Sequence, residues 1–103
     1  MTTNPVFASE RLFQTWRYTV SHRQLLLRSN KTNAANTRIE ILFKNVSLML
    51  IGQIFRGLTI TICDAASLNN FGMGDFSLGE RVLYQLATEN FRGFVVAGGS
   101  YGT

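Results

Sequence analysis

The sequence predicts a mainly β fold: a small antiparallel β-barrel or curved sheet roll of six to seven strands with at most one or two short helices. Apolar and polar residues alternate along several short stretches, which is the period of a strand. Threonine and β-branched residues are dense in "LTITIC", residues 58–63. Short polar or glycine-containing segments separate these stretches, as in an antiparallel meander. An α+β fold is the alternative, because one later segment also fits a helix.

Length and composition predict one domain over 1–103, with frayed ends at 1–10 and 99–103. Hydrophobic residues make up 46% of the chain, enough for a core, whereas only 16% are charged. So little charge favours self-association. The single cysteine fits a reducing compartment. We expect a cytoplasmic protein without membrane association, because no signal sequence is evident and no apolar run approaches the roughly 20 residues of a span.

Residues 15–29 predict a hairpin with a loop at 21–24. Its register sets Val20 opposite Leu25 and Tyr18 opposite Leu27. The only histidine, His22, then lies in the exposed turn, where the sequence identifies no partner for acid–base catalysis. The expected core face carries Trp16, Tyr18, Val20, Leu25 and Leu27, and the other face carries Thr15, Arg17, Thr19, Leu26 and Arg28.

This register makes two predictions about the polar face of the hairpin. It sets Arg17 opposite Arg28, a repulsive pair that could bind an anion or, more simply, be relieved by Glu40 of the next strand. It also sets Thr19 opposite Leu26. With Leu42 these two residues form an outward apolar strip, which we interpret as an interface between copies or as a surface covered by residues 64–79.

The later segments are expected in the following order. Residues 38–46 and 47–51 predict two strands, and 58–63 predicts another that places Cys63 on its outer face, where we expect it to be inert. The connection 64–79 carries Phe71, Met73 and Phe76, either as a binding loop or as a plug for the core. Residues 78–90 fit either a helix or the first part of a second hairpin, and the hairpin is favoured because "FVVAG" at 94–98 is a strand.

Three segments, "WRYTVSHRQLLLRSNK", "TRIEILFKNV" and "RGFVVAG", resemble short bacterial β-rich proteins that have no known activity. The resemblance covers about two thirds of the chain and includes no catalytic motif. It implies an all-β domain and no particular function.

The sequence favours a non-enzymatic binding or assembly module that forms a dimer or larger homo-oligomer. No catalytic set is evident, and the usual His/Cys ligands for a metal are missing, so we expect no cofactor. One alternative is nucleic-acid binding, since residues 1–44 hold seven basic and two acidic side chains, although the predicted register turns the aromatic residues inward. The other alternative is a small-ligand protein that uses the 64–79 loop.

Overall fold

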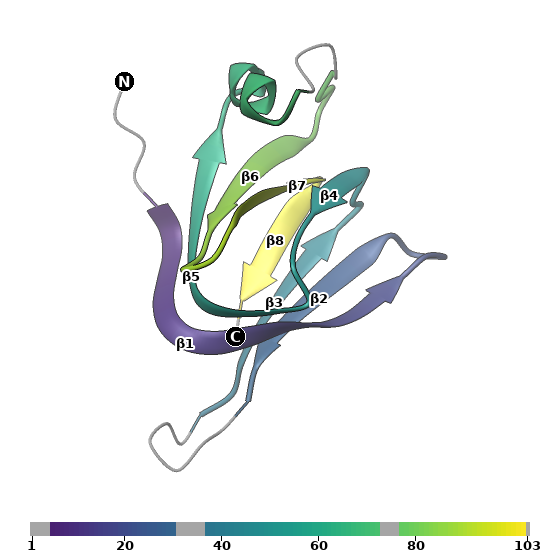
Figure 1. Ribbon diagram of the computed structural model, residues 1–103. Coiled ribbons are helices and arrows are strands. Elements are labelled where there is room, and N and C mark those ends of the chain that lie inside the picture. The colour runs from purple at the N-terminus through teal and green to yellow at the C-terminus, as the bar shows by residue number, and fades with distance from the viewer. Residues whose placement is uncertain (1–4, 31–36, 73–76, 103) are drawn as a thin grey trace.

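The computed structural model describes residues 5–30, 37–72 and 77–102, which form one antiparallel sheet and one short helix (Figure 1). The sheet is strongly curved but not closed, which confirms the mainly β class, and its strand order is β4-β7-β6-β5-β1-β2-β3-β8. The strands are β1 (Pro5–Thr19), β2 (Gln24–Ser29), β3 (Ile39–Lys44), β4 (Leu48–Leu50), β5 (Ile54–Cys63), β6 (Val82–Ala87), β7 (Arg92–Ala97) and β8 (Gly99–Gly102). The helix is the 3₁₀ segment η1 (Ala65–Phe71).

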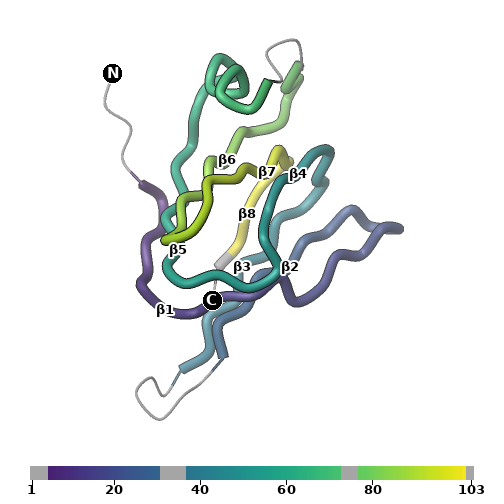
Figure 2. Tube along the Cα trace, in the orientation of Figure 1, coloured from purple at the N-terminus to yellow at the C-terminus, as the bar shows by residue number. Residues whose placement is uncertain are grey.

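The two edge strands, β4 and β8, are short continuations of strands inside the sheet. The chain bends between β3 and β4 at Asn45, which has a positive φ of 54°, and between β7 and β8 at Gly98. Backbone hydrogen bonds join the two bends: Ser47 N–H donates to the Val96 carbonyl at 2.9 Å, and Gly98 N–H donates to that of Lys44 at 2.8 Å. The sheet therefore curls until its two edges approach each other (Figure 2).

The core fills the inside of this curl. Strand alternation points every second apolar side chain inward, and aromatic rings pack at its centre, with the Phe43 and Tyr84 centroids 5.2 Å apart. Glycine is needed at position 93, because a Cβ there would overlap the Leu50 carbonyl of β4. The buried cluster comprises Phe13, Leu25, Leu27, Ile41, Phe43, Val46, Phe55, Leu58, Ile60, Tyr84, Leu86, Val95 and Ala97.

The first hairpin differs from the predicted register. Tyr18, not Val20, lies opposite Leu25, because the chain turns over 20–23, where Arg23 has a φ of 52° and its N–H reaches the Val20 carbonyl. A β-bulge between Thr15 and Arg17 then adds one residue to β1 and turns Trp16 outward. The inward placement of Trp16 and Val20 is therefore wrong, since they are 46% and 77% exposed. His22 lies exposed in the turn, as expected.

The ends of the chain also differ from the expectation. Residues 5–10, assigned to a frayed end, belong to β1 and pair with β5, and residues 99–102 form β8 and pair with β3. The favoured hairpin over 78–97 is confirmed, because β6 and β7 pair antiparallel around the turn at 88–91. The Thr88 hydroxyl stabilises this turn by accepting from the N–H groups of Asn90 and Phe91.

The connection that follows β5 packs on the outward side of the sheet. Its η1 segment lies over β6 and β7, with the Phe71 ring 4.8 Å from that of Phe94. We call this the covered face, formed by Leu68, Leu83, Phe94 and Val96. Met73 and Phe76, the other two aromatic or apolar residues predicted for this loop, lie outside the described residues. Within the described chain, no helix is long and apolar enough to cross a membrane.

Candidate binding surface

The outward side of β1, β2, β3 and β8 forms a second face, on the part of the sheet away from η1. Directly opposite residues on antiparallel strands point to the same side, so the register orders their side chains into rows across the strands. We call this the open face, formed by Trp16, Arg17, Leu26, Arg28, Glu40, Leu42, Lys44 and Tyr101.

An apolar row runs across the middle of the open face. Leu26 lies opposite Leu42, as predicted for neighbouring strands, and Tyr101 of β8 lies opposite Leu42 on its other side. The two leucines are half-buried, whereas Tyr101 is 59% exposed. Thr19 does not belong to this row, because the register places it opposite Gln24 and puts Arg17 opposite Leu26. The predicted apolar strip is thus corrected at one of its three positions.

The residues beside the apolar row form a stacked and ion-paired group. Arg28 lies opposite Gln14, not opposite Arg17 as predicted, because of the shifted register. Its guanidinium forms a salt bridge with Glu40 at 2.5 Å, so the predicted Arg28–Glu40 pairing is confirmed. The same guanidinium lies 4.0 Å from the centroid of the Trp16 ring, a cation–π geometry. Arg28 thus contacts both the Glu40 carboxylate and the indole.

The far side of the row has a similar arrangement of an aromatic ring and a cation. The Lys44 ammonium lies 4.7 Å from the centroid of the Tyr101 ring. Lys44 and Arg17 are exposed, and in the described part of the chain neither forms a salt bridge. The open face therefore carries Arg17, Arg28 and Lys44 against one acid, Glu40, and its net charge is positive.

The sequence alone missed two of these residues for different reasons. Tyr101 was assigned to a frayed tail, because one aromatic residue in a short glycine-rich segment carries no core signal. The outward turn of Trp16 depends on a bulge that leaves the alternating pattern unchanged. No feature of the residues themselves indicates it.

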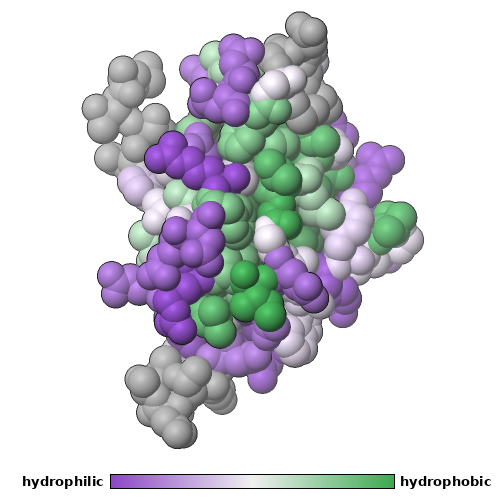
Figure 3. Space-filling model, in the orientation of Figure 1, coloured by the Kyte–Doolittle hydropathy of each residue, from purple (hydrophilic) through white to green (hydrophobic). Residues whose placement is uncertain are grey.

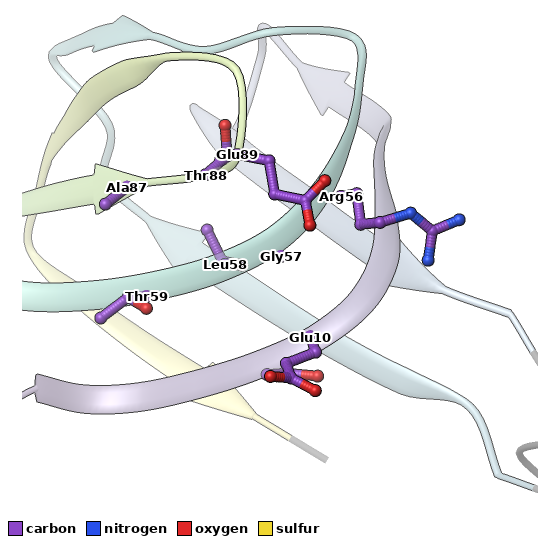
Figure 4. A pocket seen from close by; sticks show the side chains of 9 residues that line it. Glu10, Arg56, Gly57, Leu58, Thr59, Ala87, Thr88 and Glu89 are labelled. Atoms are coloured by element: carbon purple, nitrogen blue, oxygen red, sulfur yellow. The ribbon is translucent and has the colours of Figure 1, made fainter.

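A hollow of about 570 Å³ between β1, β5 and the β6–β7 turn is an alternative site (Figure 4). Glu10 of β1 and Glu89 of the β6–β7 turn line it together with Arg56 of β5 and the hydroxyl groups of Ser9, Thr59 and Thr88. Its three charged side chains are all exposed. Among the described residues, no three metal-ligating side chains come together. The hollow thus offers polar groups but no buried charge to orient a ligand.

The remaining sequence candidates stay apart from the open face. Cys63 at the end of β5 is half-buried beside the covered face, and its thiol donates a hydrogen bond to the Gln85 amide oxygen at 3.4 Å. Phe71 packs against the covered face and is only partly exposed. Figure 3 shows further hydrophobic residues gathered over β4, β6 and β7. The exposed apolar side chains of this part of the chain include Met49 and Leu50 of β4.

Comparisons with known proteins add no further assignment. No family model, curated protein or solved structure matches the chain.

Proposed function

We propose that the protein is a non-enzymatic, cytoplasmic binding module that holds single-stranded nucleic acid on its open face. The observation that carries the proposal is the outward position of Trp16 and Tyr101, each beside a cation on the same face. Single strands bind sheets through aromatic rings that stack on bases and through basic side chains that neutralise phosphates. The predicted register turned the aromatic residues inward, but Trp16 faces outward, whereas Tyr18 and Phe43 do pack at the core.

The form of the face favours single strands over a duplex. Bases of a single strand are free to lie flat on Trp16, on Tyr101 and on the leucines between them, and each stack on an aromatic ring contributes about 1–3 kcal/mol. A duplex presents its bases only as edges in the grooves, which calls for a protruding helix or ribbon. The open face is instead a surface of four adjacent strands, with apolar side chains at its centre.

Self-association through the same face is the second candidate, and the Leu26–Leu42 pair favours it. In a two-fold symmetric dimer the same surface of each chain lies against the other. Two open faces placed against each other would bring together two surfaces of net positive charge, since the one acid, Glu40, is already paired with Arg28. The charge of the face thus fits a polyanion better than a second copy of itself.

The test uses the only tryptophan of the chain as its own reporter. Titration with oligouridylate and oligothymidylate at about 50 mM salt should quench Trp16 fluorescence, and the affinity should fall steeply as salt rises. In anisotropy with a labelled oligonucleotide, Trp16→Ala and Tyr101→Ala should each lower the affinity roughly 5- to 100-fold. Val20→Ala is the matched control, because Val20 is 77% exposed at the hairpin turn and off the face.

The absence of both fluorescence quenching and an anisotropy change at low salt would contradict the proposal. A ligand-free protein that sediments as a dimer, and that becomes a monomer in Leu42→Glu, would instead support self-association.

A further inference from the structure

The open face also indicates where the sugar–phosphate backbone runs, an inference that rests on the proposed function. The rows of side chains that cross the open face succeed one another along the direction of the strands. On β2 the order is Gln24, Leu26, Arg28, and on the adjacent β3 it is Lys44, Leu42, Glu40. The apolar row therefore has the Arg28–Glu40 pair on one side and Lys44 with Gln24 on the other.

The two sides differ in the charge that they offer to a phosphate. On the first side the positive charge of Arg28 is compensated, because Glu40 binds it at 2.5 Å. The Glu40 side chain is 32% exposed, so its carboxylate still repels an approaching phosphate. On the second side Lys44 is exposed, and Arg17 is exposed at the β1 end of the apolar row. These two cations have no salt-bridge partner among the described residues.

We propose that the backbone of a bound single strand crosses β2, β3 and β8 on the Lys44 side of the apolar row and reaches Arg17 at the β1 end of that row. Its bases lie over the apolar row, and Glu40 excludes the backbone from the opposite side. Adjacent strands lie about 4.8 Å apart, so Arg17 and Tyr101, three strands from each other, span roughly 14 Å. This is a length of a few nucleotides. The Arg28 guanidinium, paired with Glu40 and stacked on the Trp16 ring, does not bind a phosphate in this arrangement.

The salt dependence of binding tests this path. Each neutralised phosphate of a single strand contributes about 0.7 to the slope of log affinity against log salt. Lys44→Gln and Arg17→Gln should each lower the slope by about 0.7, so that a fourfold rise in salt weakens their binding about two- to threefold less than that of the wild type. The double variant Arg28→Gln/Glu40→Gln, which removes a compensated pair, should keep the wild-type slope.

Glu40→Gln alone should tighten binding and steepen the slope, because it removes the repulsion and releases the charge of Arg28. Arg92→Gln is the matched control, since it removes one exposed charge from β7, away from the face. Two outcomes would overturn the proposed path but leave the proposed function standing. One is an unchanged salt slope in Lys44→Gln and Arg17→Gln. The other is weaker binding by Glu40→Gln at a wild-type free energy of unfolding. A wild-type protein that does not bind at low salt would overturn both the path and the proposed function.

Discussion

The covered face and the open face are two parts of the outward side of one sheet, and their apolar side chains differ in exposure. On the covered face η1 lies over β6 and β7, and Leu68 and Leu83 are 0% and 1% exposed. On the open face the leucines stay half-buried, Tyr101 is 59% exposed and cations flank the aromatic rings. The apolar side chains of the covered face are buried by another segment of the same chain. An apolar side chain that remains accessible beside uncompensated charge is available to a ligand.

The largest effect expected from this difference concerns stability. Leu68→Ala should lower the free energy of unfolding by about 2–5 kcal/mol, because it leaves a cavity under η1. Its counterpart on the open face, Leu42→Ala, should cost only about 1 kcal/mol, since that side chain is half in water. Urea denaturation of both variants measures the difference. Equal losses would mean that the open face is as much a part of the core as the covered face.

A charge on the apolar row should separate binding from folding. Leu42→Glu places a carboxylate beside Tyr101, and we expect it to weaken oligonucleotide binding by at least about tenfold through phosphate repulsion. The protein should stay folded, because a half-buried carboxylate can reach water from the surface of the sheet. Circular dichroism and anisotropy on one preparation give both readouts. Loss of the folded state would show that something else in the chain needs this surface.

The smallest effect is expected at Cys63, at the margin of the covered face. Cys63→Ser keeps a donor near the Gln85 amide oxygen and loses little packing, so the melting temperature should change by no more than a few degrees. Nucleic-acid binding should be unaffected, because β5 and β6 do not contribute to the open face. A thermal melt and one titration suffice. Loss of an activity in a folded Cys63→Ser protein would contradict the non-enzymatic proposal.

Alternation predicted most of the fold because it is a local property. The mainly β class, the inward Ile41 and Phe43 and the second hairpin all follow from the period of two. The Arg28–Glu40 pair could also be predicted, since neighbouring strands of similar length leave few choices of partner. The sequence pattern is sufficient to predict these features, and the strand pairing among them positions most of the open face.

The features that were missed depend on single residues in unusual backbone positions. The early turn at Arg23 and the bulge at Trp16 change the register and the direction of one side chain without altering the apolar pattern. Strand β8 was missed for another reason: its four residues have no apolar core signal and are held by pairing with β3, a contact distant in sequence. Long-range pairing of this kind leaves no local trace.

Strand β8 links the open face to the local dynamics of the molecule. It is a four-residue edge strand whose described pairing is with β3 alone, so we expect it to detach more easily than the strands inside the sheet. The core cluster contains no residue of β8, so detachment would leave its members in place but would remove the Tyr101 ring from the open face. A ligand stacked on Tyr101 must therefore bind the docked state preferentially, and it protects the β8–β3 amides from hydrogen exchange by the same free energy by which docking strengthens its affinity.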